Sequence, residues 1–219
     1  MRNMKYLLLS IVFVLAFAKA GSAQSNSDQK AEELLKKVAQ KFKSYDNLYF
    51  TYKGNFKNVK NSINTDIQGD ATLSGQKYNV NYMGTTFLFD GNRQYVINRE
   101  DEQVTISKPA SEDDGITPSN ILSFYEKGYT KKWDILQDVK GRKIQYVKLI
   151  PIKSDTDYKN VLLGIDKQSN HIYNVIITEK SGTVVTFTLK SLKVNEPLAK
   201  NTFRFDESDY PDFDIEQLD

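Results

Sequence analysis

The residues that most often perform enzymatic chemistry are scarce in this chain. It has no cysteine and one histidine, His171, among 219 residues. A Ser-His-Asp arrangement would have to use His171 as its base. That residue follows Ser169-Asn170 in a turn predicted between two strands, where an exposed polar residue is expected for structural reasons. No Gly-rich phosphate loop or zinc-ligand spacing is present. The sequence therefore favours a protein that is not an enzyme and carries no cofactor.

Acidic residues are plentiful, but their spacing forms no recognisable site. Glu112, Asp113 and Asp114 precede Gly115, and a second acidic run extends over residues 206–216. The tail lacks the spaced ligands and turn glycine of a calcium loop. No pair of carboxylates stands out as the acid and base of a glycosidase. A solvated surface is the simpler interpretation, so no metal site is predicted.

The remaining feature is a set of large apolar residues around a predicted hairpin. Two apolar runs, Thr-Thr-Phe-Leu-Phe and Arg-Gln-Tyr-Val-Ile, flank Asp90-Gly91-Asn92. An Asp-Gly pair between apolar runs is the strongest short-range signal for a hairpin. Alternate residues of a strand lie on one face. The pattern thus predicts one aromatic, apolar face formed by Phe87, Phe89, Tyr95 and Ile97.

The period of two continues through most of the chain. Apolar and polar residues alternate from Leu48 to Phe56, from Ile63 to Leu73 and from Tyr78 to Tyr82. Further strands are predicted around 104–106, 133–139, 142–150, 160–166, 172–179 and 183–194. Clean alternation over consecutive strands indicates an antiparallel sheet with one buried and one wet face. In total we expect about eleven strands.

Two helices with apolar stripes are predicted to cover this sheet. The first spans residues 27–45, with Ala31, Leu34, Leu35, Val38, Ala39 and Phe42 at helical spacing. The second begins at Thr117-Pro118, ends near Gly128 and carries Ile121, Leu122, Phe124 and Tyr125. A sheet of so many strands curls, and a curled sheet under apolar helices can hold a ligand pocket. The alternative is that the same residues form an ordinary packed core.

The N-terminus has the pattern of a secretory signal peptide. Arg2 and Lys5 precede an apolar run from Tyr6 to Phe17, which is short for a membrane span, and cleavage is expected after Ala23. Residues 24–219 are then expected to form one domain that is soluble and not lipid-anchored, because no cysteine follows the cleavage site. The whole chain has 30 Lys+Arg and 28 Asp+Glu, and this balance gives no electrostatic case for nucleic acid binding.

The order and spacing of several segments resemble the LolA family of periplasmic lipoprotein carriers. The matching segments, which span the chain after the signal, are Phe42-Lys43-Ser44-Tyr45 before Leu48-Tyr49-Phe50-Thr51-Tyr52, Gly69-Asp70, Asp90-Gly91 with Tyr95, Thr117-Pro118, Leu149-Ile150-Pro151, and Asn195 and Leu198 before Phe203-Arg204-Phe205. Well-known members carry an Arg-Pro pair whose arginine latches a lid over the cavity. This chain has Gly75-Gln76 at the matching positions, so that latch is absent or replaced.

The resemblance implies a mainly β (α+β) fold, in which helices cover the concave apolar face of an incomplete antiparallel barrel. It also implies a monomeric periplasmic carrier of lipoproteins, which receives their acyl chains from an inner-membrane ABC transporter and delivers them to an outer-membrane acceptor. A binder of another lipid or amphiphile, and a non-catalytic envelope scaffold, stay open as alternatives. The residues expected to contact the cargo are Phe50, Tyr52, Ile67, Tyr78, Tyr82, Phe87, Phe89, Tyr95, Ile97, Ile121, Leu122 and Tyr125.

Overall fold

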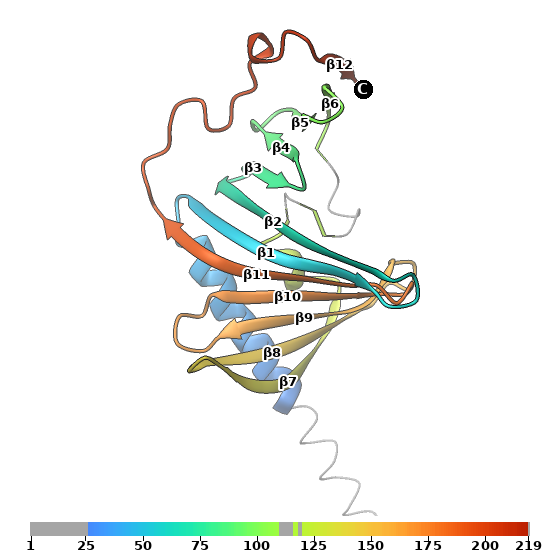
Figure 1. The fold of residues 1–219 in the computed structure, drawn as a ribbon. Coiled ribbons are helices and arrows are strands. Elements are labelled where there is room, and N and C mark those ends of the chain that lie inside the picture. The colour runs from blue at the N-terminus through green and yellow to red at the C-terminus, as the bar shows by residue number, and fades with distance from the viewer. Residues whose placement is uncertain (1–25, 110–115, 118–119, 219) are drawn as a thin grey trace, which may run out of the picture.

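A single open sheet dominates the computed structural model, which describes residues 26–109, 116–117 and 120–218 (Figure 1). Its twelve strands are β1 (Leu48–Asn58), β2 (Ile63–Ser74), β3 (Lys77–Tyr82), β4 (Thr85–Phe89), β5 (Gln94–Asn98), β6 (Gln103–Ser107), β7 (Tyr129–Val139), β8 (Arg142–Pro151), β9 (Tyr158–Asp166), β10 (Ile172–Glu179), β11 (Val184–Val194) and β12 (Asp214–Gln217). They lie in the order β12-β6-β5-β4-β3-β2-β1-β11-β10-β9-β8-β7. Strands β12 and β7 are unpaired on their outer sides, so the barrel is incomplete.

The predicted hairpin at Asp90-Gly91 is confirmed as β4 and β5. The Asp90 N–H donates to the Arg93 carbonyl at 3.3 Å, and the Asp90 carboxylate accepts from the N–H groups of Asn92 at 2.7 Å and Arg93 at 2.8 Å. Gly91 has a φ of 103°, a conformation that suits glycine. This side chain and this glycine explain why the chain reverses here.

The acidic tail is more ordered than the sequence indicates. Residues 214–217 form β12, which runs parallel to β6 and places Ile215 opposite Val104. Interpreting the whole tail as a solvated segment was therefore wrong for these residues. Ile215 is the one large apolar residue in this short strand, which leaves too little alternation for a pattern to detect.

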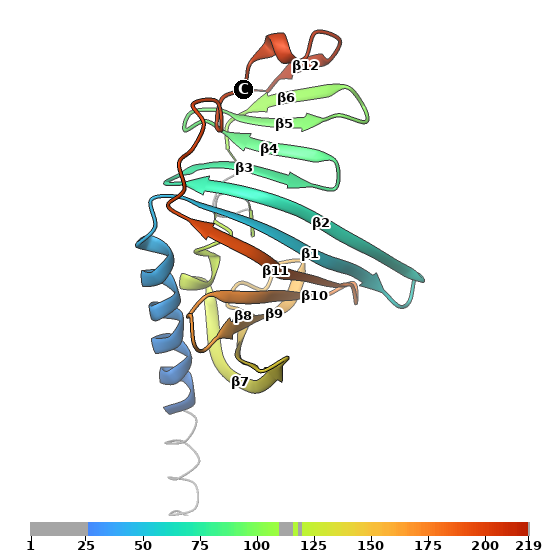
Figure 2. The same cartoon turned by 60° about the vertical axis from the view of Figure 1, so that its left-hand side comes forward.

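The first predicted helix is confirmed over residues 26–43, and its apolar stripe faces the sheet. Ala31 and Val38 are fully buried, and Leu35 is 2% exposed. Figure 2 shows the helix beside β7 to β11, whereas β3 to β6 and β12 lie beyond its end. Two ion pairs hold its first turns to β7, namely Lys132 with Asp28 and Lys131 with Glu32. The helix therefore covers only one half of the sheet.

The second predicted helix is not an α-helix in the described residues. Residues 120–123 form turns, and η2 (Phe124–Glu126) is a single 3-10 turn. The Thr117 N–H donates to the Asn120 side chain at 2.8 Å. The Asn120 carbonyl accepts from the N–H groups of Ser123 at 2.8 Å and Phe124 at 2.7 Å. The Phe124 bond spans four residues, as in an α-helix, but the next bond joins the Glu126 N–H to the Ser123 carbonyl at 2.8 Å and spans only three. The segment therefore tightens into a 3-10 turn.

Candidate functional site

The register of β1 to β4 brings apolar side chains together in three rows on the concave face. The inner row is Leu48, Leu73, Tyr78 and Phe89; the middle row is Phe50, Ala71, Val80 and Phe87; the outer row is Tyr52, Gly69, Tyr82 and Thr85. The inner row is buried beside the helix. Apart from Ala71, the side chains of the middle and outer rows are only half-buried. Burial thus decreases along the strands, away from the helix end.

The outer row is built around Tyr52, whose ring crosses over Gly69. The Tyr52 hydroxyl donates to the Asn81 carbonyl at 2.7 Å. A Cβ atom at Gly69 would lie 2.5 Å from the Tyr52 hydroxyl oxygen and 2.0 Å from the Asn81 carbonyl oxygen, so only glycine fits here. Burial raises the pKa of Tyr52 above its usual range, with smaller contributions from Tyr82 and Asp70. Tyr52 therefore stays neutral and presents an aromatic surface.

Phe187 of β11 completes this aromatic surface and was missed by the sequence prediction. Its ring centroid lies 5.7 Å from that of Tyr52 and 6.3 Å from that of Tyr82. Phe187 pairs with Gly54 of β1 and with Val175 of β10. It alternates with Val185 and Leu189 in the sequence, and this alternation was the signal that could have identified it.

A groove of about 340 Å³ opens beside the inner row. Its apolar lining comes from the end of the helix, the inner row and the segment before η2: Ala39, Phe42, Leu48, Leu73, Tyr78, Ile121 and Leu122. Its rim is polar, with Lys43, Asp46, Gln76, Lys77 and Glu126. Lys43 and Glu126 pair at 3.0 Å between the helix and η2. The groove thus borders the inner row, and the middle and outer rows lie on the other side of that buried row.

The structure does not bring Tyr95 and Ile97 to this region. Phe87 lies opposite Val96, and Phe89 lies opposite Gln94. Because directly opposed residues share a face, Tyr95 and Ile97 point to the other side of the sheet. The prediction was wrong because the turn occupies the four residues 90–93. With a turn of this length, odd-numbered residues of β4 lie opposite even-numbered residues of β5.

Tyr95 and Ile97 instead belong to a second, smaller core. Ile97, Val104 and Ile106 are buried there and are packed by Phe205, Tyr210, Phe213 and Ile215 from the C-terminal segment. The Tyr95 and Phe205 rings stack with centroids 4.6 Å apart. This cluster holds the C-terminal segment on the face opposite the groove.

Several other predicted cargo residues are closed off from solvent. Ile67 is 2% exposed, Tyr78 is 1% exposed and Phe89 is 7% exposed. Tyr125 is fully buried, and no hydrogen-bond partner for its hydroxyl is found in the described part of the chain. Of these four, Tyr78 lines the groove. The accessible part of the predicted set is Phe50, Tyr52, Tyr82 and Phe87 on the sheet, with Ile121 and Leu122 at the groove.

His171 is half-buried and contacts the helix end, so the prediction of an exposed turn residue was wrong. Its Nε2 lies 2.7 Å from the Tyr45 hydroxyl, and its ring centroid lies 5.8 Å from that of Phe42. Burial lowers the pKa of His171, and the positive charge of Lys41 lowers it further. This contact ties the end of the helix to the β9–β10 turn.

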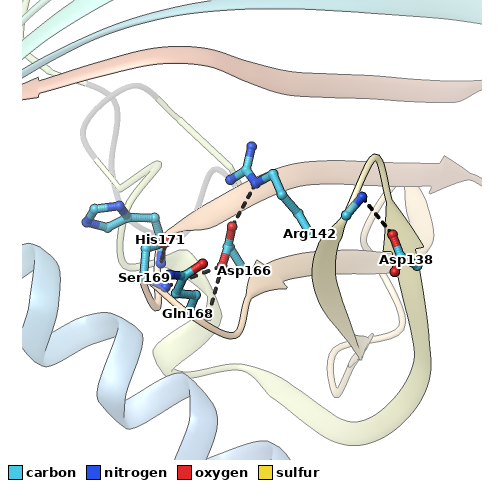
Figure 3. Close-up of polar contacts among 7 residues, drawn as sticks. Asp138, Arg142, Asp166, Gln168, Ser169 and His171 are labelled. Carbon is cyan, nitrogen blue, oxygen red and sulfur yellow. Dashed lines mark hydrogen bonds and ion pairs between the residues drawn. The ribbon is translucent and has the colours of Figure 1, made fainter.

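The same turn is held by Asp166, as Figure 3 shows. Its carboxylate accepts from Arg142 Nε at 2.8 Å and from the N–H groups of Gln168 at 2.8 Å and Ser169 at 3.3 Å. Burial alone would raise the pKa of Asp166, but these hydrogen bonds outweigh it and lower the pKa. The His171 N–H donates to Ser169 Oγ at 3.2 Å. Asp166 and Ser169 thus shape the turn, and the hydrogen bond of the imidazole ring goes to Tyr45.

Metal-ligand clusters and membrane-spanning helices are both absent from the described ranges. In residues 26–109, 116–117 and 120–218, no cluster of His, Cys, Asp or Glu is arranged to hold a metal ion. The acidic residues Glu112 to Asp114 lie outside these ranges. No helix in the described part of the chain combines the length and apolar character needed to cross a membrane.

Known proteins match this chain in sequence and in fold. The family model for outer membrane lipoprotein carrier protein LolA matches residues 77–206. An outer-membrane lipoprotein carrier protein of Pseudoalteromonas translucida is 27% identical over 153 residues, which are 64% of this chain and 71% of the relative. A conserved protein from Thermus thermophilus superposes with a TM-score of 0.59 at 10% identity, covering 86% of this chain and 99% of that one. A LolA-superfamily protein from Nitrosomonas europaea gives 0.44 at 13% identity, with 80% and 97% covered. The chain belongs to the LolA family.

Proposed function

We propose that this protein is a periplasmic carrier that binds the acyl chains of lipoproteins and moves them between the inner and outer membranes. The observation that carries the proposal is the half-buried aromatic surface of Phe50, Tyr52, Tyr82, Phe87 and Phe187. The groove lies beyond the buried inner row. Family membership and the lipoprotein-carrier relative support the same cargo.

The energetics of the cargo explain why such a surface would be useful. Each methylene group removed from water contributes about 0.8 kcal/mol, so one sixteen-carbon chain represents on the order of 10 kcal/mol. A lipoprotein therefore needs an apolar surface to cross an aqueous compartment. Aromatic residues suit this role, because they offer a large apolar area with few rotatable bonds. Binding and release would need no chemistry, only different affinities in different conformations.

The proposal is tested by loading the protein with a fluorescent fatty acid and comparing Phe87→Asp with Thr86→Asp. The two variants place the same charge on opposite faces of β4. Phe87→Asp should weaken loading by at least tenfold, on the order expected for a carboxylate in an apolar site, and Thr86→Asp should load normally. Phe87 is a better test than Phe89, which is 7% exposed and whose replacement would unfold the core.

The nature of the cargo is tested by native mass spectrometry of protein purified from its own periplasm. An acylated lipoprotein bound one to one is expected. A bound free lipid or glycolipid would instead mean that the cargo is another amphiphile. Gly75 and Gln76 at the groove favour this alternative, because they stand where well-known family members carry the arginine that latches the lid. An empty protein that also takes up no fatty acid would contradict the carrier proposal and favour a scaffold.

A further inference from the structure

The turn between β1 and β2 exposes an apolar side chain that no described residue covers. Val59 is 76% exposed, the largest value among the exposed large apolar side chains of the described residues, and Ile63 in the next strand is 39% exposed. Figure 2 shows this hairpin projecting at the end of the sheet opposite the helix end. The groove is lined by residues at the helix end. An isolated exposed apolar residue is ordinary. What is unusual here is that the fold holds the exposed residue in place.

Hydrogen bonds from a buried asparagine fix the turn. Asn58 is 4% exposed, and its Nδ2 donates to Thr183 Oγ1 in the β10–β11 turn at 2.9 Å. Its Oδ1 accepts from the Asn61 N–H at 3.2 Å. Val59 is therefore held outward by the fold itself, because the residue before it is anchored to a neighbouring hairpin.

Val59 stands between two basic residues in the sequence. Lys57 and Lys60 are exposed, and no acidic residue occurs in the sequence between Asp46 and Asp66. The end of β10 and its turn, to which Asn58 is anchored, add one acidic and one basic residue, Glu179 and Lys180. In the described part of the chain, neither Lys57 nor Lys60 takes part in an ion pair. The tip thus combines two apolar side chains with two unpaired positive charges.

This combination fits a lipid surface better than a protein partner. A stable protein interface buries about 800 Å² on each side and is depleted in lysine, whereas a narrow turn offers little area. An anionic bilayer needs only shallow insertion, and lysine side chains can extend to its headgroups. We propose that the β1–β2 tip docks reversibly on anionic membrane surfaces, with Val59 and Ile63 entering the interface and Lys57 and Lys60 contacting the headgroups.

Docking through this tip would also orient the proposed cargo site. The outer row, with Tyr52 and Tyr82, lies nearer this end of the sheet than the inner row does. The outer row would then lie closer to the bilayer than the inner row. This inference goes beyond the carrier function, since membrane docking by the empty protein requires no cargo.

The test is cosedimentation of the chain from Gln24 onward with phosphatidylcholine vesicles, with and without phosphatidylglycerol. The first 23 residues are omitted because their apolar run would itself bind lipid. The protein should bind the phosphatidylglycerol vesicles, and added salt should weaken this binding. The variant Lys57→Glu/Lys60→Glu should partition at least about tenfold more weakly. Val59→Ser should weaken partitioning by on the order of tenfold.

The matched control is Lys140→Glu/Lys167→Glu, which makes the same charge change at exposed turns at the opposite end of the sheet. It should bind vesicles like the parent protein. Absence of binding by the parent protein, an equal loss in this control, or unchanged binding by Val59→Ser would each overturn the proposal. Phe87→Asp should keep vesicle binding, and Lys57→Glu/Lys60→Glu should keep fatty-acid loading, so this inference and the carrier function can fail separately.

Discussion

The two halves of the sheet use the same alternation of apolar and polar residues for different purposes. In the half under the helix, Val147, Leu149, Val161, Leu163 and Ile165 have no exposed surface. In the other half, Phe50, Tyr52, Val80, Tyr82 and Phe87 remain half-buried. These five fully buried residues of β8 and β9 are aliphatic, whereas four of the five half-buried residues in the open half are aromatic. The difference lies in the cover: among the described residues, the helix over residues 26–43 packs on one half only.

From this comparison we expect stability and the proposed cargo binding to reside in separate regions. Closely packed aliphatic side chains lose contacts and leave a cavity when they are truncated. Half-buried aromatic side chains lose less on truncation, because solvent already reaches them. A substitution in one half should therefore affect one property much more than the other.

The largest expected effect is on stability, from Leu163→Ala in the covered half. Leu163 is fully buried, and such a truncation costs about 2–5 kcal/mol. Urea denaturation should show this loss, while the folded fraction keeps its affinity for a fatty-acid probe. A similar loss of probe affinity would break the proposed separation of the two halves.

The converse change is Phe50→Ala in the open half. The Phe50 ring lies 6.3 Å from the Tyr52 ring and is half-buried. We expect probe binding to weaken by on the order of tenfold, about 1.4 kcal/mol, with a loss of folding stability no larger than that of Leu163→Ala. Titration calorimetry and urea denaturation measure the two quantities. A destabilisation as large as that of Leu163→Ala, with unchanged binding, would show that the aromatic rows are ordinary core.

A smaller effect is expected at the boundary of the two halves, from Tyr45→Phe. This variant removes the hydroxyl that lies 2.7 Å from His171 Nε2, which should cost about 1 kcal/mol. Amide exchange should become faster at the helix end, next to the groove. The control is Tyr49→Phe, which removes a hydroxyl from the face of β1 opposite to that of Leu48 and Phe50. Equal effects of the two variants would mean that the contact with His171 does not hold the helix.

Much of this organisation could be predicted from the sequence, because alternation and turn residues are local signals. The helix stripe and the β4–β5 hairpin were confirmed for that reason. The face of Tyr95 and Ile97 depended on the length of one turn, which alternation alone does not report. The contact between His171 and Tyr45 joins residues 126 positions apart, and no sequence period reports such a pairing.

The same contact predicts the smallest effect, a dependence of stability on pH. Because the folded protein lowers the pKa of His171 from its ordinary 6.5, the unfolded chain binds the proton more tightly. Stability should therefore be highest above about pH 6.5 and decrease as the pH falls below it. The pKa of Asp166 is lowered as well, but its contribution is lost only as the pH falls through the carboxylate range, below about 4. Urea midpoints measured between about pH 7.5 and 5 should fall for the parent protein and fall less for His171→Gln. An identical slope for the variant would show that His171 titrates alike in the folded and unfolded chains, and that the boundary between the two halves carries no proton linkage.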